Sequence, residues 1–480
     1  MFSFTSIEQY HAQLKGKSST CLQAVQHYLH AIESKHDLNS FLEVFAEEAL
    51  TRASELDALS FEQWGKLHGV IIGIKDLICY KDHKVSASSK ILEGFTSLFS
   101  ATAVERLIAQ GAIIIGRQNC DEFGMGSTNE NSAYGPVVNP VNADLVPGGS
   151  SGGSAAAVKA GLCMASLGTD TGGSVRLPAD FCGTVGFKPS YGRVSRYGLI
   201  AYASSFDQIG IIANTVKDVA QILEVIAGPD DYDSTVSNTK VDSYTVEIEQ
   251  DQKFRIAYFP EWIEHSSIDP EITSQIKKLL ADLKEKGHTV EPVSFKLTDY
   301  IVPTYYVLTT AEASSNLGRF DGVRYGYQKS GNQKDLKTFY KQNRSDGFGK
   351  EVKRRIMLGS FVLSAGYYDA YFTKAQQVRR LLQQQTELIF KDFDILLAPN
   401  SPTTAYKMGE KTKNPLAMYM GDIFTVFANL TGIPSISLPV FKHSSNLPFG
   451  VQAMSSRFNE VFLARFSQRL MPRSVCMDTV

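Results

Sequence analysis

Apolar residues recur with helical spacing near the start of the chain. Thr5 and Glu8, and again Thr20 and Gln23, have the spacing of a capping box, in which side chains satisfy the first free N–H groups of a helix. The second pair precedes a run whose apolar residues share one helical face: Leu22, Val25, Leu29 and Ile32. The pattern predicts that the first part of the chain is helical.

The pattern then changes to short unbroken apolar runs, which are typical of buried strands. Such runs extend from Val70 to Ile74 and from Ala112 to Ile115, and a helix-like stretch ending at Gly111 precedes the second. Strands that alternate with helices predict an α/β sheet.

A polar stretch over residues 229–250 is the strongest linker candidate, because it begins at a Gly-Pro-Asp-Asp turn. After it, Phe254 to Phe259 is predicted as a strand, and Asp269-Pro270-Glu271 as the start of a helix that ends at Gly287 before another strand. The inward face of that helix is predicted to consist of Ile272, Ile276, Leu279, Leu280 and Leu283. We expect a single domain over residues 1–480, although the βα unit after the linker fits either a lobe on the same sheet or a separate domain.

Composition is that of a globular protein, with 480 residues, 43% hydrophobic and 20% charged. The net charge of −2 gives no global basic field for nucleic acid or membranes. No apolar run is long enough to span a bilayer and no targeting peptide is visible, so we expect a cytoplasmic protein. The cysteines lack CxxC spacing, which favours reduced thiols over a zinc site or disulfides: Cys21, Cys79, Cys120, Cys163, Cys182 and Cys476.

The segment from Pro147 to Pro178 carries the densest signal. It contains two Gly-Gly-Ser turns 24 residues apart, with an Ala-rich helix expected from about Ser154 to Ala165. A phosphate-binding loop would need Gly-Lys-Ser/Thr at its end, which is missing here. A pair of structural turns remains an alternative. The third interpretation is a serine nucleophile, which needs a neighbouring base.

Lys75 is the candidate for that base, because it interrupts an apolar run from Gly69 to Ile78. Burial disfavours the charged ammonium and lowers the pKa of a lysine, which makes the amine a possible proton acceptor. The sequence equally allows a structural lysine that reaches solvent or pairs with Asp76.

Three motifs together resemble the amidase signature family. They are Gly-Ile-Lys75-Asp, Gly-Gly-Ser150-Ser-Gly-Gly-Ser, and Asp170-Thr-Gly-Gly-Ser174-Val-Arg-Leu-Pro-Ala. Ser150 follows Lys75 by 75 residues and precedes Ser174 by 24, as in that family. The resemblance implies an α/β fold with a large, mixed, mostly parallel twisted sheet and helices on both faces.

The resemblance also implies roles for single residues. Ser174 would be the acylating nucleophile, Ser150 the bridging serine after a cis peptide bond from Gly149, and Lys75 the final base. An oxyanion hole would consist of the backbone N–H groups of Thr171, Gly172 and Gly173, together with that of Ser174. No metal is implied.

Two later segments, residues 312–326 and 347–359, resemble the branch of the family that serves as the A subunit of tRNA-dependent amidotransferases. A glutaminase must hold the α-carboxylate and α-ammonium of glutamine with opposite charges. The resemblance implies Arg355 for the carboxylate and Asp422 for the ammonium. Further implied pocket residues are Tyr305, Met125, Gly126 and Ser127. Plainer interpretations are a solvated helix charge for Arg355, a helix cap for Asp422 and a plain loop around Met125.

The implied activity is hydrolysis of glutamine to glutamate, with ammonia passed to a second subunit. The implied partners are the B and C subunits in a heterotrimer, with tRNA contacted through the complex and no membrane. ATP and Mg²⁺ would be used by the assembled complex, and this chain itself would bind no cofactor. The rival interpretations are a stand-alone amidase acting on small amides and a catalytically inactive scaffold subunit.

Overall fold

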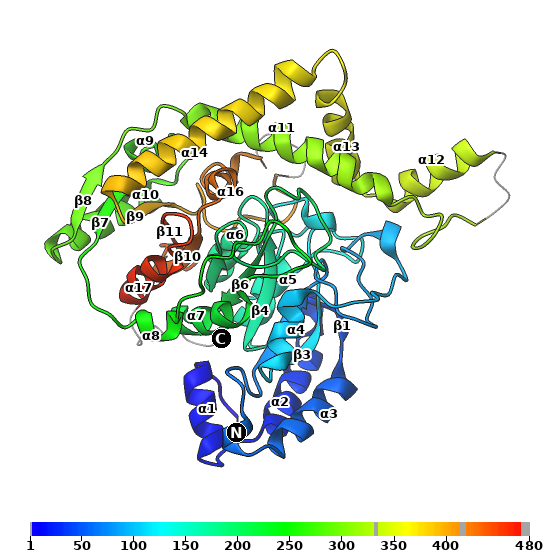
Figure 1. The fold of residues 1–480 in the computed structure, drawn as a ribbon, viewed down its shortest axis with the longest axis vertical. Helices are drawn as coiled ribbons and strands as arrows, with labels where there is room; N and C mark the ends of the chain where they lie inside the picture. Colours follow the sequence, from blue (N-terminus) through cyan, green and yellow to red (C-terminus); the bar gives the residue numbers. More distant parts are fainter. Residues whose placement is uncertain (1, 331–334, 412–418, 472–480) are drawn as a thin grey trace.

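A computed structural model describes residues 2–330, 335–411 and 419–471. Within these residues, one sheet of eleven strands runs through the molecule (Figure 1). In spatial order the strands are β1 (Phe41–Val44), β3 (Ile113–Gln118), β2 (Ile71–Lys75), β4 (Ala165–Asp170), β6 (Gln208–Ala213), β5 (Val185–Lys188), β10 (Ser435–Lys442), β11 (Pro448–Met454), β9 (Ile395–Pro399), β7 (Arg255–Tyr258) and β8 (Thr289–Pro292).

The sheet is mixed, as predicted. Parallel pairing occurs in two separate groups, β3–β2–β4 and β9–β7–β8. The strands between these groups pair antiparallel, as does the edge strand β1. The expected parallel character therefore holds at the βα units that the sequence pattern revealed, whereas the centre contains the β10–β11 hairpin and the antiparallel pair β5–β6.

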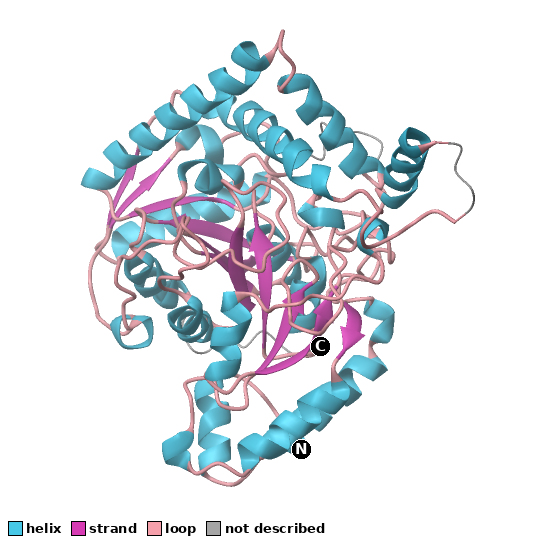
Figure 2. Ribbon diagram, turned by 45° about the vertical axis from the view of Figure 1, so that its right-hand side comes forward, coloured by secondary structure: helices cyan, strands magenta, loops and turns pink. Residues whose placement is uncertain are grey.

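Helices lie on both sides of the sheet (Figure 2). The helices α1 to α3 gather at one end of the molecule, and α11, α13 and α14 at the other (Figure 1). Their bounds are α1 (Ile7–Lys15), α2 (Cys21–Ser34), α3 (Ala46–Asp57), α4 (Thr102–Ala109), α5 (Gly152–Lys159), α6 (Arg176–Cys182), α7 (Val216–Ile226), α8 (Tyr244–Glu247), α9 (Pro260–Ile263), α10 (Pro270–Glu285), α11 (Thr298–Asn316), α12 (Leu336–Gly347), α13 (Lys350–Val362), α14 (Lys374–Asp392), α16 (Val426–Thr431) and α17 (Glu460–Leu470).

The apolar runs form strands where the pattern placed them. The run starting at Val70 contains β2, and the run starting at Ala112 contains β3, with α4 before it. Every residue of both strands is buried. This burial on both faces explains why these segments contain continuous apolar runs instead of alternating polar and apolar residues.

Two predicted helix bounds need correction. The N-cap of α1 is Ser6, whose hydroxyl accepts from the N–H of Gln9, so the predicted cap at Thr5 is one residue early. The predicted cap at Thr20 is confirmed by its bond from the Gln23 N–H. The Ala-rich helix α5 ends at Lys159, earlier than expected, because the chain turns at Gly161 with φ 69°, a left-handed conformation suited to glycine.

The unit after the polar stretch lies on the same sheet. Residues 229–250 contain one short helix, α8, and β7 then pairs with β9 on one side and β8 on the other. Asp269 caps α10, and the predicted inward face is buried apart from Leu279, which is half-buried. Among the described residues, no helix has both the length and the apolar character needed to cross a membrane.

Candidate active site

Lys75 is the last residue of β2 and is completely buried. Its ammonium nitrogen lies 2.7 Å from Ser150 Oγ, 2.9 Å from Ser151 Oγ and 2.8 Å from Thr169 Oγ1. Strand β4, which carries Thr169, is the parallel neighbour of β2, so the two strands end side by side. The sheet thus positions the Lys75 amine beside a cluster of hydroxyl groups.

The surroundings of Lys75 favour its neutral form. Burial lowers the pKa of its amine to about 8, and the nearby acidic groups oppose that shift only in part. The alternative pairing with Asp76 does not occur, because that carboxylate accepts from the N–H groups of Ser86 and Ser88 and forms an ion pair with Arg117. At pH 7 about one tenth of Lys75 is therefore a free amine, far more than for an exposed lysine.

Ser150 occupies the turn before α5, and its peptide bond with Gly149 is cis, which confirms the geometry implied by the motif. The turn is packed so closely that a Cβ at Gly149 would lie 2.2 Å from the Asp121 carboxylate. The hydroxyl of Ser150 is buried and in contact with Lys75.

The second Gly-Gly-Ser turn connects β4 to α6 and carries Ser174, which is 8% exposed. The N–H of Ser151 donates to the carbonyl of Ser174 over 3.1 Å, so the two serine turns lie against each other. The interpretation as two unrelated structural turns is therefore wrong: the turns, 24 residues apart in sequence, contact each other beside Lys75.

A buried ionic network fixes the Ser174 turn. Asp170 accepts from the N–H groups of Gly173 and Val175 and forms an ion pair with Arg176. Burial opposes ionisation of Asp170, but Arg176 outweighs it and lowers the pKa of this carboxyl to about 2. Gly173 has φ 126°, a conformation that an L side chain rarely adopts.

The backbone around Ser174 offers donors for an oxyanion. Within the part of the chain that the structure describes, the N–H groups of Thr171, Gly172 and Ser174 have no hydrogen-bond partner. The N–H of Gly173 is bound to Asp170 over 2.8 Å, which leaves the predicted contribution of Gly173 without a free donor. The turn must satisfy the buried Asp170 carboxylate, and Gly173 serves that purpose.

Arg355 lies on α13 and is 3% exposed. Its Nε donates to Glu351 one turn earlier over 2.9 Å, and its Nη1 donates to the Tyr202 hydroxyl over 2.8 Å. Its Nη2 makes no hydrogen bond to any described residue. The interpretation as a solvated helix charge is wrong, because the guanidinium is buried and keeps one donor group free.

Asp422 is 8% exposed and lies beside the Ser127 hydroxyl, which is 2.8 Å from Oδ1 and 3.0 Å from Oδ2. The Tyr306 hydroxyl donates to Oδ2 over 2.8 Å. Burial raises the pKa of Asp422 to about 6, against the effect of these hydrogen bonds. The carboxylate also precedes α16 by several residues, so it is not simply the cap of that helix.

Tyr306 connects the two charged residues. Its ring centroid lies 5.6 Å from the Arg355 guanidinium while its hydroxyl binds Asp422. Tyr419 stacks on this ring at 4.1 Å and donates to Glu351, the partner of Arg355. The neighbouring Tyr305 packs over the nucleophile turn: a Cβ at Gly172 would lie 2.3 Å from the Tyr305 hydroxyl oxygen.

The three residues from Met125 to Ser127 have different contacts in the site. Ser127 reaches Asp422 through its hydroxyl, whereas the Met125 side chain is fully buried. Gly126 packs on Asp121, since a Cβ there would be 2.3 Å from the carboxyl carbon. The segment is therefore a closely packed part of the site and not a plain loop.

Sequence reasoning missed several residues that complete the site: Ser151, Thr169, Asp170, Tyr202, Tyr306 and Tyr419. Ser151 and Asp170 stand inside the motifs that revealed the serines and Thr169 directly precedes one of them, so their position was a usable signal. The tyrosines meet Arg355 and Asp422 only after folding, and their spacing in the chain gives no comparable signal.

The cysteines of the described residues, Cys21, Cys79, Cys120, Cys163 and Cys182, are all free thiols and buried. Cys476 lies outside the described residues. Cys120 is next to the site, with its sulfur 3.2 Å from Ser88 Oγ, and burial raises the pKa of its thiol to about 12. The prediction of reduced thiols is confirmed for these residues.

Comparison with known proteins agrees with this geometry. The amidase family model matches residues 23–463. The A subunit of glutamyl-tRNA(Gln) amidotransferase from Acidobacterium capsulatum is 50% identical over 448 residues, which cover 93% of this chain and 94% of that protein. The counterpart from Chlorobaculum parvum is 49% identical over 465 residues, 95% of either chain.

Solved structures lead to the same family. The crystal structure of the glutamyl-tRNA(Gln) amidotransferase A subunit from Thermotoga maritima superposes with a TM-score of 0.78 at 41% identity, over 96% of this chain and 93% of that one. A crystal structure of an amidase gives a TM-score of 0.79 at 26% identity, over 96% and 98%. The chain therefore belongs to the amidase family, within the group formed by the glutamyl-tRNA(Gln) amidotransferase A subunits.

Proposed function

We propose that this chain is the glutaminase subunit of a tRNA-dependent amidotransferase and supplies ammonia for converting Glu-tRNA(Gln) to Gln-tRNA(Gln). The observation that carries the proposal is the combination of a buried, hydroxyl-bound Lys75 with two opposite charges, Arg355 and Asp422, on either side of Tyr306. The first feature suits an amidase. The second suits glutamine among the possible amides.

The proposed reaction starts at Ser174, whose Oγ attacks the side-chain carbonyl carbon of glutamine. The proton of Ser174 passes to Ser150, and Ser150 gives its own proton to the Lys75 amine, which lies 2.7 Å away. The negative charge that forms on the carbonyl oxygen is stabilised by free N–H groups of the nucleophile turn.

Collapse of this intermediate breaks the C–N bond. The proton returns from Lys75 through Ser150 to the leaving nitrogen, so ammonia departs and a glutamyl ester remains on Ser174. Water then attacks the ester with the same groups acting as base and acid, and glutamate leaves. Each proton that Lys75 accepts is returned in the same half-reaction.

Recognition of glutamine uses the other half of the site. The free Nη2 of Arg355 is proposed to donate to the α-carboxylate, with Glu351 and Tyr202 holding the guanidinium in place. Asp422 is proposed to accept from the α-ammonium. Tyr305, which packs over Gly172, would place the side-chain amide above Ser174.

The remaining parts of the proposal concern the assembly. The B and C subunits would complete a heterotrimer in the cytoplasm, tRNA would bind through the complex, and ATP with Mg²⁺ would activate the tRNA-bound carboxylate on one of these partners. The same assembly would extend to Asp-tRNA(Asn) if that partner accepts it. The nearly full-length similarity to amidotransferase A subunits supports this assignment over a stand-alone amidase.

The test is amidation of Glu-tRNA(Gln) by this chain assembled with B and C subunits from the same organism, with glutamine or ammonium chloride as nitrogen donor. We expect the wild-type complex to use both donors, and the Ser174→Ala complex to use ammonium only. Loss of both activities in the variant would refute the division of labour. Hydrolysis of small aryl amides with no amidation by the complex would favour the stand-alone amidase.

A further inference from the structure

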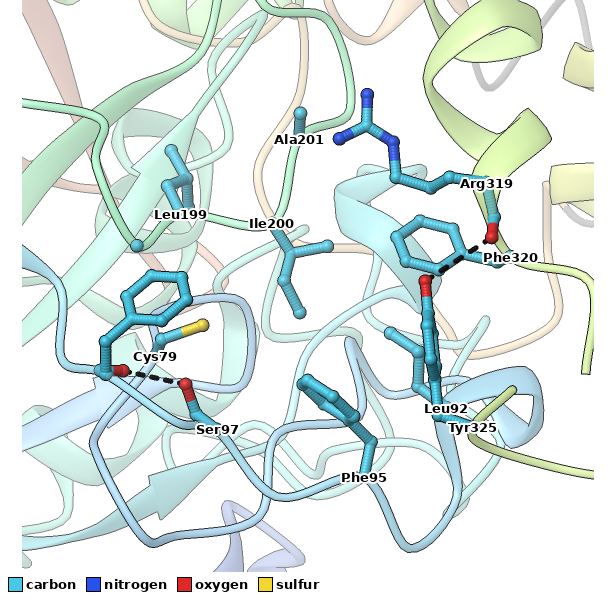
Figure 3. A pocket seen from close by; sticks show the side chains of 12 residues that line it. Cys79, Leu92, Phe95, Ser97, Leu199, Ile200, Ala201, Arg319, Phe320 and Tyr325 are labelled. Atoms are coloured by element: carbon cyan, nitrogen blue, oxygen red, sulfur yellow. Dashed lines mark hydrogen bonds between the residues drawn. The ribbon is translucent and has the colours of Figure 1, made fainter. Parts of the chain in front are cut away.

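A second concave site lies away from the serines, lined by loops that follow β2 and β5 and by the segment that follows α11 (Figure 3). Its volume is about 290 Å³. Leu92, Phe95, Ile200 and Phe320 are among the apolar side chains that form its walls, and Arg319 is the cation at its edge. None of the proposed catalytic or glutamine-binding residues lines this cavity.

The cavity opens onto an apolar surface. Leu98 is 80% exposed, and Phe99 on the cavity wall is 44% exposed. The Phe99 ring stacks on Tyr197 at 4.9 Å, and Tyr197 stacks on Tyr232, which is 74% exposed, at 4.6 Å. An occupant of the cavity would therefore also meet a row of aromatic rings outside it, and a macromolecule can cover such a surface whereas a small ligand cannot.

Arg319 makes the edge of the cavity favourable for a negatively charged group. Its Nε and Nη2 donate to the carbonyl and side-chain oxygens of Asn316, and its Nη1 has no partner among the described residues. Arg324, the next cation along the loop, is 3.7 Å from Asp321 and largely exposed. A carboxylate next to an apolar anchor would complement this edge, because a guanidinium with a free N–H binds carboxylates well.

The walls of the cavity are continuous with the glutamine site. Ala201 lines the cavity, and the next residue, Tyr202, binds Arg355. Phe320 packs at 5.2 Å on Phe123, which is followed by Gly124, where a Cβ would be 3.6 Å from Ser150 Oγ. Ala201 thus connects the cavity to Arg355 through Tyr202, and Phe320 connects it to Ser150 through Phe123 and Gly124.

We propose that this cavity is a docking site for another subunit of the amidotransferase, which inserts one large apolar side chain and presents a neighbouring carboxylate to Arg319. The inference rests on the proposed function. The volume is at the low end for a small-molecule site and suits one side chain, and the exposed aromatic row provides the surrounding contact area. Docking there would couple the presence of the partner to the geometry around Arg355 and Ser150.

The test uses the tagged chain co-expressed with untagged B and C subunits. We expect Arg319→Glu and Ile200→Asp to reduce the amount of partner that copurifies by about tenfold or more, since the first reverses the charge at the edge of the cavity and the second places a charge in its apolar wall. Arg319 is exposed, so its reversal leaves the fold intact. The matched control is Arg380→Glu, an exposed arginine on α14, which should retain both partners.

A second measurement locates the contact directly. Benzoylphenylalanine introduced in place of Phe99 should, on irradiation, crosslink to a peptide of the B or C subunit that contains a large apolar residue next to Asp or Glu. Full copurification by Arg319→Glu and Ile200→Asp, or absence of a crosslink in an intact complex, would overturn the proposal. Failure of the proposed function is distinct, because it appears in the wild-type chain as loss of glutamine-dependent amidation.

Discussion

Lys75 and Arg355 are both buried cations, yet their surroundings affect them in opposite ways. Lys75 is surrounded by hydroxyl groups and, within the described chain, forms no ion pair, so burial lowers its pKa to about 8. Arg355 is held by the Glu351 carboxylate and by aromatic rings, which keep its pKa above the usual range despite burial. One protein interior thus prepares an amine that can lose its proton and a guanidinium that stays charged, as the proposed roles of base and carboxylate partner require.

The two sets of residues also stand on different parts of the fold. The proposed catalytic residues, between positions 75 and 174, stand at the end of β2 or on turns beside β2 and β4. The proposed glutamine-binding residues, between positions 305 and 422, come from α11, α13 and the segment before α16. The proposed chemistry is therefore supported by the sheet, and the proposed recognition by two helices and the turn before α16, so we expect that substitutions can disturb the two separately.

The largest expected effect comes from Ser174→Ala. Removal of the nucleophile should lower kcat for glutamine hydrolysis by at least about 10³-fold, as in other serine enzymes that lose their nucleophile. Release of glutamate from glutamine by the assembled complex is the measurement. A Ser445→Ala variant, at an exposed serine far along the chain, serves as control. Substantial hydrolysis by Ser174→Ala would mean that another group attacks the amide.

Lys75→Ala should reduce kcat by about 10²–10⁴-fold, because general-base assistance is worth that much. In the wild-type enzyme, kcat/KM should rise with pH along a limb whose midpoint lies near 8, since the amine must lose its proton before it can accept one from Ser150. A stopped assay from pH 6 to 10 checks this. A pH-independent rate, or near-normal activity without Lys75, would remove lysine from the mechanism.

Asp422→Asn should act on binding instead. Losing one charge partner of the α-ammonium should raise KM for glutamine by about 10–100-fold with a smaller change in kcat. Reversal to lysine should act more strongly. Because the pKa of Asp422 is about 6 and the ionised form is needed, wild-type KM should be lowest above that pH and should rise as pH falls through it. Unchanged saturation curves would contradict the assigned role.

The smallest effect is expected for Tyr306→Phe, which removes one hydrogen bond to Asp422 and keeps the ring beside Arg355. KM should rise about fivefold, the equivalent of roughly 1 kcal/mol. Tyr300→Phe on the same helix, at a tyrosine that is 55% exposed, is the matched control and should leave KM unchanged. Equal behaviour of the two variants would mean that Tyr306 does not position the carboxylate.

The same contrast explains what the sequence reveals. Lys75, Ser150 and Ser174 are recognisable because a charged residue inside an apolar run and two glycine-rich turns are unusual patterns. The strands β2 and β3 follow from continuous apolar runs. The charge of Arg355 suggested its role only through resemblance, since burial by Tyr202 and Tyr306 arises from contacts between distant segments.

The order of the strands in the sheet cannot be predicted from the hydrophobic pattern. The pattern identifies βα units but does not show that β10 and β11 enter the middle of the sheet between β5 and β9. Likewise, the engagement of the Gly173 N–H by Asp170 depends on how a single turn closes. Local sequence determines which segments form elements, and long-range packing decides how they pair.

The buried thiol of Cys120 offers an internal reporter of local opening. Thiolates react with alkylating agents and buried thiols do not, so labelling of Cys120 requires the loops around Lys75 to part. The labelling rate of Cys120 in native buffer, followed by mass spectrometry of the peptide that contains it, would measure the free energy of that opening. A bound substrate would slow the labelling, which would give the stability of the catalytic region separately from that of the whole molecule.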